Sequence, residues 1–152
     1  MNPDKLAKEL NSIPRLPHMS LQIFESLKNL LPMVAVELLI TRPDRSFVLI
    51  EKVGTSGAWA LPGGYIGFNE SPEDACRRIA KRDLGMVLSS IIFFKLFNWP
   101  EGSLRSTHGH ALSLLFKCKT GKNIKRGKYF RKIPVGVLPH HIIMLDEALL
   151  AQ

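Results

Sequence analysis

A helix with clearly marked ends, preceded by a glycine-rich loop, constrains the fold of this chain more than any other feature. The helix is predicted over residues 71–84, because Ser71 suits the N-cap, Pro72 the first helical position, and Asp74 completes a capping-box pattern. A short strand predicted over residues 59–62 leads into a pair of glycines, whose backbone can approach a ligand closely. This strand, loop and helix are typical of an α/β domain.

The other predicted elements complete one α/β domain with a mixed sheet flanked by helices. Strands over 33–40 and 47–50 enclose a turn that contains Pro and Asp, and we expect them to form a hairpin. The remaining predictions are helices over 4–10, 21–31 and 139–151, and strands over 91–97 and 111–118.

One acid lies on the apolar face of the predicted helix. On a helical wheel Asp83 falls in the arc formed by residues such as Ala75 and Ile79. An inward carboxylate is costly unless it is paired or binds a cation. Two interpretations stay open: an ion pair with Arg78 that only supports the structure, or a functional site at the glycine loop.

The chain is basic, with a formal net charge of +8 and a pI of about 9.8. This excess favours anionic partners such as nucleotides, phosphosugars or nucleic acid. Much of it lies between Lys117 and Lys132, which is either a solvated loop or a phosphate-binding segment. No apolar run reaches the ~20 residues of a membrane span, and the first residues lack a signal-peptide pattern, so we expect a cytoplasmic protein.

The stretch GYIGFNESPEDACRRIAKRDLGM, from residue 64 to residue 86, resembles the Nudix box. The matching positions are Gly64, Glu70, Arg78, Gly85 and Met86, with Asp83 at the last acidic position. The resemblance implies a Nudix-type α/β/α sandwich with a mixed β-sheet over residues 32–152. Residues 1–31 are then an N-terminal helical extension.

Two departures from the box concern the metal. Ile79 and Arg82 stand where the pattern has the first and second glutamates of its helix, which in the family gather Mg²⁺ around a pyrophosphate. The ending RIAKRDLG is similar to the reduced box of GDP-mannose mannosyl hydrolases. In that subgroup one Mg²⁺, held by the helix-terminal carboxylate and a glycine-loop carbonyl, steadies the departing diphosphate while water attacks the sugar.

By this resemblance, the chain takes Mg²⁺ as its cofactor and each site residue receives a role. The expected metal ligands are Asp83, a carbonyl of Gly63 or Gly64, and Glu70. The expected catalytic residues are Arg78, which would neutralise the diphosphate, and Glu37, which would contact the substrate. The expected substrate-binding residues are Lys52, Trp59 and Tyr65.

The general base of the subgroup has no counterpart at its usual place. The subgroup has a histidine on the loop before its last strand, but residues 120–131 contain neither a histidine nor a carboxylate. General-base catalysis needs such a group near the attacking water. The remaining candidates are His108, His110, His140 and His141, each of which also has an ordinary structural interpretation.

The leading hypothesis is a Nudix hydrolase of a nucleoside-diphosphate sugar, GDP-mannose-like, or a related nucleotide. The alternative is a catalytically inactive Nudix domain that binds nucleotide or RNA as a sensor, with Arg82 holding the anion in place of a metal. A third hypothesis, pyrophosphatase chemistry with acids from elsewhere, would rely on Glu73, Asp74 or Glu101. Related domains often dimerise, so the resemblance also implies a homodimer.

Overall fold

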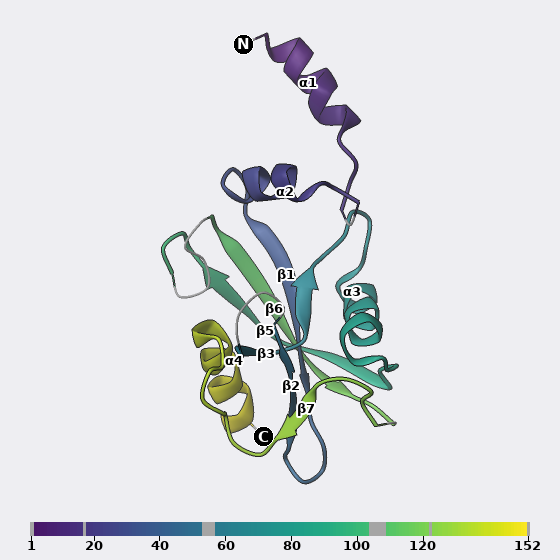
Figure 1. Cartoon of the computed structure of the whole chain (residues 1–152), viewed down its shortest axis with the longest axis vertical. Coiled ribbons are helices and arrows are strands. Elements are labelled where there is room, and N and C mark those ends of the chain that lie inside the picture. The colour runs from purple at the N-terminus through teal and green to yellow at the C-terminus, as the bar shows by residue number, and fades with distance from the viewer. Residues whose placement is uncertain (1, 17, 53–56, 104–108, 122, 152) are drawn as a thin grey trace.

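The computed structural model describes residues 2–16, 18–52, 57–103, 109–121 and 123–151. Two sheets lie at the centre of the molecule, one of four strands in the order β4-β1-β6-β5 and one of three in the order β3-β2-β7 (Figure 1). The strands are β1 (Met33–Ile40), β2 (Phe47–Glu51), β3 (Trp59–Ala60), β4 (Gly63–Tyr65), β5 (Ser90–Trp99), β6 (Ala111–Lys119) and β7 (Lys128–Phe130).

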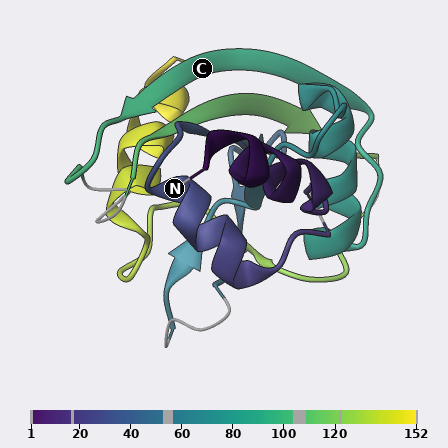
Figure 2. The same ribbon diagram turned by 90° about the horizontal axis from the view of Figure 1, so that it is seen from above.

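Helices cover the sheets on two sides. The helices are α1 (Pro3–Ser12), α2 (Leu21–Lys28), α3 (Pro72–Ile79) with the π-helical turn η1 (Ala80–Leu84), and α4 (Pro139–Leu150). Figures 1 and 2 show α3 and α4 on opposite sides of the strands. The four-stranded sheet is mixed, because β1 runs parallel to β6 and antiparallel to β4. The expected α/β/α architecture with a mixed sheet is therefore confirmed.

Strand β1 is covered on both faces. Leu38 packs in the core cluster that includes α3, and Leu39 packs in the cluster that includes α4. Such burial explains the nearly continuous apolar run of this strand. It also leaves Glu37 as a carboxylate only 3% exposed in the middle of the sheet, where burial is costly without a partner.

The expected hairpin between the first two strands is wrong. Pairing ends at the turn, with a single bridge between Thr41 and Phe47 and a hydrogen bond from the Arg42 N–H to the Ser46 carbonyl. Beyond it β2 pairs with β3 and β7 and so belongs to the second sheet. The physical reason is burial: Val48 packs in the core cluster that includes α3, and Phe47 and Leu49 pack in the cluster that includes α4, so β2 is covered on both faces.

The helix predicted over 71–84 is present, but it is not regular to its end. Ser71 caps it as expected, since its side chain accepts a hydrogen bond from the Asp74 N–H at 3.1 Å. The α-helix stops at Ile79, and Ala80–Leu84 forms a π-helical turn that closes at Gly85, where φ is +65°. The short strand β4 in the glycine loop was not predicted.

The two N-terminal helices differ in how they contact the domain. Helix α1 contains no buried residue and projects from the body of the molecule (Figure 1). Helix α2 lies over one end of the sheet, where the Phe24 ring packs edge-on against Tyr65 at 5.0 Å between centroids. Helix α2 ends at Lys28 rather than at residue 31 as predicted. Within the described residues, no helix has the length and apolar character needed to cross a bilayer.

Candidate functional site

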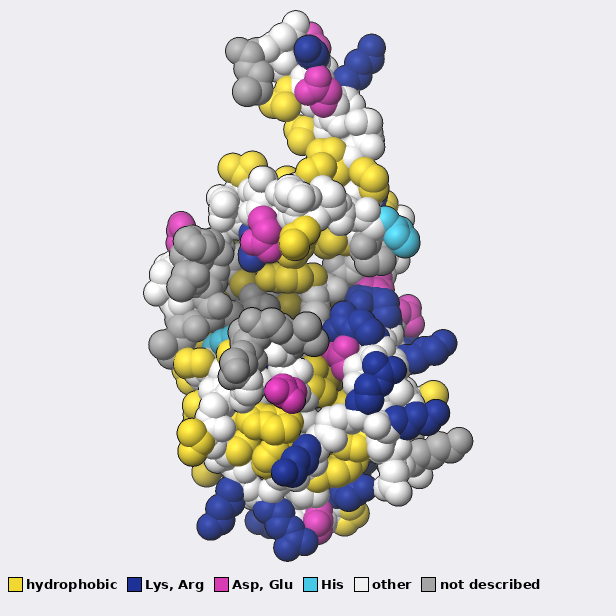
Figure 3. Space-filling view, viewed as in Figure 1, with side chains coloured by type: hydrophobic (Ala, Val, Ile, Leu, Met, Phe, Trp, Pro, Cys, Tyr) yellow, Lys and Arg dark blue, Asp and Glu magenta, His cyan; other side chains and the backbone are white. Residues whose placement is uncertain are grey.

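A pocket of about 850 Å³ opens where α2, the glycine loop, the end of η1 and the start of α4 meet. It is lined by Lys28, Met33, Glu37, Ile50, Glu51, Lys52, Ala60, Leu61, Gly63, Gly64, Tyr65, Arg82, Asp83, His110, Ala111, Arg126, Gly127, Leu138, His140 and His141. Figure 3 shows a hollow below α2, with lysine and arginine side chains gathered beside it over the α3 segment.

Glu37 and His141 form a buried pair in this pocket. The Glu37 Oε2 and His141 Nε2 atoms lie 3.6 Å apart, and each side chain is 5% exposed. The Leu61 N–H donates to His141 Nδ1 at 3.0 Å, so Nδ1 carries no proton. A neutral His141 therefore carries its proton on Nε2, which faces the carboxylate.

Gly63 is required by close packing against Glu37, whereas Gly64 lies beside Arg82. A β-carbon built on Gly63 would lie 1.7 Å from the Glu37 Oε2 atom and 3.0 Å from the Val36 carbonyl oxygen. A β-carbon on Gly64 would lie 3.4 Å from an Arg82 nitrogen. Only a residue without a side chain leaves the Glu37 carboxylate in place against Gly63.

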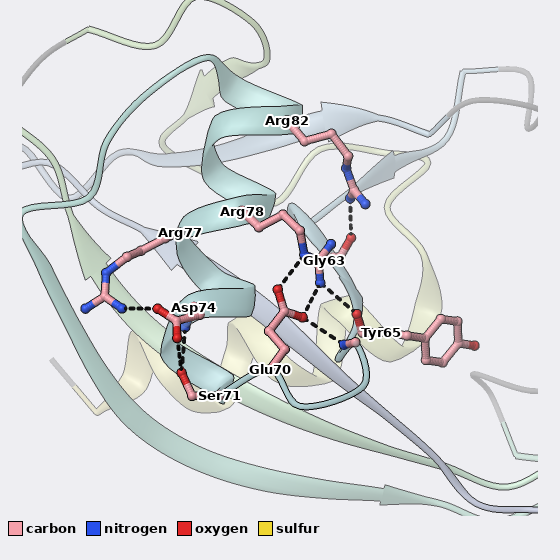
Figure 4. Close-up of polar contacts among 9 residues, drawn as sticks. Gly63, Tyr65, Glu70, Ser71, Asp74, Arg77, Arg78 and Arg82 are labelled. Atoms are coloured by element: carbon pink, nitrogen blue, oxygen red, sulfur yellow. Dashed lines mark hydrogen bonds and ion pairs between the residues drawn. The ribbon is translucent and has the colours of Figure 1, made fainter. Parts of the chain in front are cut away.

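Arg78 fastens the glycine loop to α3 (Figure 4). Its Nε donates to Glu70 Oε1 at 2.6 Å and its Nη2 to Glu70 Oε2 at 2.7 Å. A further bond runs from Nη2 to the Tyr65 carbonyl at 3.0 Å, and Glu70 also accepts the Gly67 N–H at 2.7 Å. The hydrogen bonds with Arg78 lower the pKa of Glu70 and raise that of Arg78. This network holds the loop in shape.

Arg82 binds the group of oxygens at the end of η1. Its Nε donates to Asp83 Oδ1 at 2.5 Å, and its Nη2 donates to Asp83 Oδ2 at 2.8 Å and to the Gly63 carbonyl at 2.9 Å. The hydrogen bond with Asp83 raises the pKa of Arg82, and the charge of Glu37 acts in the same direction. Asp83 is thus paired with Arg82, not with Arg78 as the structural interpretation of the sequence had it.

The structure brings most of the expected site residues together. Those that line the pocket are Glu37, Lys52, Gly63, Gly64, Tyr65 and Asp83. Arg78 and Glu70 instead face each other between α3 and the loop. Trp59 packs edge-on against Phe130, 4.9 Å between ring centroids, and belongs to the core cluster on the α4 side. The roles assigned to all of these residues stay predictions.

Other pocket residues had been only open candidates in the sequence, or had not been marked at all. Of the histidines, His110, His140 and His141 line the pocket, whereas His108 lies outside the described residues. Arg126 comes from the basic stretch, which was the one available signal for it. Lys28 comes from α2, and nothing in its local sequence marks it as a site residue.

The described residues offer no preformed metal site built from side chains alone. Among them, no three His, Cys, Asp or Glu side chains are grouped in a way that could hold a metal ion. Ile79, which stands at the first glutamate position of the box, is fully buried in the core. The number and the position of the acidic side chains therefore differ from those of the box pattern, in which glutamates of this helix gather Mg²⁺.

Comparisons with known proteins agree on one family. The sequence model of the NUDIX domain family matches residues 31–134. The chain is 27% identical to the ADP-ribose pyrophosphatase of Methanocaldococcus jannaschii over 126 residues, which cover 76% of this chain and 72% of the relative.

Solved structures share the fold. One is the MutT NUDIX hydrolase from Burkholderia pseudomallei, with a TM-score of 0.64 and 19% identity, covering 76% of this chain and 97% of that one. Another is the NUDIX domain of Shewanella oneidensis NrtR complexed with ADP ribose, with a TM-score of 0.62 and 15% identity, covering 99% of each chain. Because the family model spans more than half of the sequence and the fold agrees, the chain belongs to the Nudix hydrolase family.

Proposed function

We propose that this chain hydrolyses a nucleoside diphosphate joined to a sugar, of the class that ADP-ribose represents. Family membership supports a hydrolase. The names of a sequence relative and of a structural neighbour both mention ADP-ribose, which supports this ligand class over others. GDP-mannose, which belongs to the same chemical class, stays a prediction from the reduced box alone.

One observation carries the proposal: a pocket of ligand size is lined by several cationic side chains, Arg82 among them. Its volume of about 850 Å³ lies in the range of small-ligand sites. Lys28, Lys52, Arg82 and Arg126 line it, and they suit the negative charges of a diphosphate. Aliphatic and aromatic residues such as Met33 and Tyr65 also line the pocket, and they suit a base or a sugar.

Glu37 is the group that we assign to accept a proton from the attacking water. It lines the pocket, and the protonated Nε2 of His141 faces it at 3.6 Å. His141 would then orient the carboxylate rather than act as the base itself, because its Nδ1 is used by the Leu61 N–H. Glu37 thereby replaces the histidine that is absent from residues 120–131.

The magnesium part of the expectation does not fit these residues as they stand. Nudix hydrolases generally use divalent metal ions such as Mg²⁺. Here both Asp83 oxygens and the Gly63 carbonyl accept hydrogen bonds from Arg82. A metal at these oxygens would need them at about 2.0–2.1 Å, in the space that the guanidinium fills.

A second candidate function is binding of the same ligand without turnover. It is favoured by Arg82 and by the buried Ile79 at positions where the box has glutamates. In this case Arg82 and the neighbouring lysines hold the diphosphate, and the protein reports on the nucleotide or recruits it. RNA, the other partner of this hypothesis, would use the basic residues of the stretch from 117 to 132.

Phosphorus NMR of ADP-ribose and GDP-mannose incubated with the protein tests the proposal. New phosphate signals that disappear with Glu37→Gln support hydrolysis at this site. Binding in calorimetry without new signals supports the second candidate. No binding and no turnover of either compound by the folded protein would sink both.

A further inference from the structure

Three oxygens in the pocket converge on one guanidinium group. Arg82 reaches both carboxylate oxygens of Asp83 and the carbonyl oxygen of Gly63, with nitrogen–oxygen distances between 2.5 and 2.9 Å. Asp83 and a glycine-loop carbonyl are the donors that the one-metal interpretation of the sequence assigned to Mg²⁺. The positively charged Arg82 side chain therefore binds the oxygens that were expected to hold Mg²⁺.

The geometry of the turn makes this contact available. Neighbouring residues of a regular α-helix do not face each other. Arg82 and Asp83 lie instead in the π-helical turn Ala80–Leu84, and their side chains meet. The Arg82 side chain then crosses the glycine pair, where a β-carbon on Gly64 would come within 3.4 Å of its Nη1 atom.

Part of the guanidinium stays available to a ligand. Nε and Nη2 make the three bonds to Asp83 and Gly63, whereas Nη1 makes no hydrogen bond to the described part of the chain. The Arg82 side chain is 52% exposed and lines the pocket. A guanidinium presents five N–H donors in a fixed fork, so an arginine held on one edge can offer the other to phosphate oxygens.

We infer that the Arg82 guanidinium takes the place of the metal ion in this site and contacts the diphosphate of the ligand directly. The inference rests on the proposed function for the identity of the ligand. Its consequence is that the ligand binds without a divalent cation. Its converse is that removing the guanidinium exposes the Asp83 carboxylate and the Gly63 carbonyl, beside the Glu37 carboxylate, to a metal ion.

The first experiment needs no nucleotide. Binding of Mn²⁺ alone is followed by electron paramagnetic resonance for the wild type, Arg82→Ala and Arg77→Ala. Arg77 is the matched control, because it lies one turn earlier on α3 and pairs with Asp74 at 2.8 Å. We expect Mn²⁺ uptake by Arg82→Ala only. Equal uptake by the wild type and Arg82→Ala, or uptake by neither, would overturn the inference.

The second experiment measures ADP-ribose binding by calorimetry, in EDTA and in excess Mg²⁺. For the wild type and Arg77→Ala we expect the same affinity in both buffers. For Arg82→Ala we expect a loss of about tenfold or more in EDTA, the scale of a lost charged hydrogen bond, with partial recovery in Mg²⁺. A wild type that binds only with Mg²⁺ contradicts the inference.

Arg82→Lys covers the case in which Arg82→Ala does not fold, as judged by circular dichroism. The lysine keeps the charge but cannot bridge Asp83 and Gly63 with a planar fork. We expect it to bind ADP-ribose in EDTA more weakly than the wild type, and unchanged affinity would count against the inference. If no variant and no wild type binds ADP-ribose, the proposed function fails, and the Mn²⁺ experiment still decides the role of Arg82.

Discussion

The His141 imidazole and the Glu37 carboxylate face each other across 3.6 Å inside the pocket, and each side chain is only 5% exposed. The contact joins the start of α4 to the middle of β1, two segments more than a hundred residues apart. It gives the one acid in an apolar strand a polar neighbour. Both residues line the pocket and are buried in the fold, so a change at either one is expected to affect ligand binding and stability together.

Replacing His141 tests this dependence. His141→Ala removes the acceptor of the Leu61 N–H and leaves Glu37 without its imidazole, so we expect the free energy of unfolding to fall by about 2–3 kcal/mol. His141→Asn places an amide oxygen near the former Nδ1, and we expect a smaller loss. Urea denaturation measures both. His110→Ala is the control, since His110 bonds Asn98 at an exposed position. An equal fall in the free energy of unfolding for the two His141 variants would show that the hydrogen bond from the Leu61 N–H does not stabilise the fold.

Gly63 is predicted to tolerate no side chain. In Gly63→Ala the new methyl group would collide with Glu37, 1.7 Å from Oε2, so strand β1 or the carboxylate must shift. We expect a loss of about 1–3 kcal/mol in the free energy of unfolding, and weaker ADP-ribose binding. Gly121→Ala is the matched control, because a β-carbon there meets nothing within 4 Å. Equal stability of the two variants in thermal melts would contradict the close contact.

The Glu70–Arg78 pair predicts a pH dependence of stability. Arg78 lowers the pKa of Glu70 below its usual 4.5, so the pair stabilises the folded state above pH 4.5. This stabilisation is lost as the pH falls through the lower folded-state pKa. We expect Glu70→Gln to lower the free energy of unfolding by about 2 kcal/mol at neutral pH, since Glu70 is 16% exposed and Arg78 would lose its charged partner.

The difference between wild type and Glu70→Gln should then shrink in urea titrations run below pH 4.5. Asp74→Asn serves as the control: Ser71 and Arg77 lower the pKa of Asp74, but its side chain is 64% exposed. Its effect should be small at every pH. A Glu70→Gln deficit that stays constant into the acid range would show that the charge of Glu70 is not what stabilises the loop.

Local signals predicted the elements well, and the partners of those elements poorly. Ser71 and Pro72 mark the helix start through capping chemistry, which depends on neighbouring residues only. The apolar run from Met33 gave β1 with the correct ends, but an apolar run does not say which strand lies beside it. Strand β4 is formed by Gly63–Tyr65, and β-propensity does not predict it because glycine is rare in strands.

The same limit applies to the site. The inward position of Asp83 follows from helical spacing, and the structure places it 12% exposed at the pocket. Its partner Arg82 does not follow from that spacing, because neighbouring residues of a regular α-helix do not face each other and the π-helical turn was not predicted. Likewise His141 could be placed beside Glu37 only once the packing of α4 against the sheet was known.

The N-terminal extension is predicted to divide into a dispensable and a required part. Helix α1 has no buried residue, so removing residues 1–12 should change the free energy of unfolding by less than about 0.5 kcal/mol. Helix α2 packs Phe24 against Tyr65 and places Lys28 in the pocket. Phe24→Ala should therefore lower both the melting temperature and the affinity for ADP-ribose, with a stability loss of about 1–2 kcal/mol. Calorimetry and thermal melts compare the two proteins directly. A truncation as damaging as Phe24→Ala would mean that α1 contributes to the site, and that the functional unit does not begin at α2.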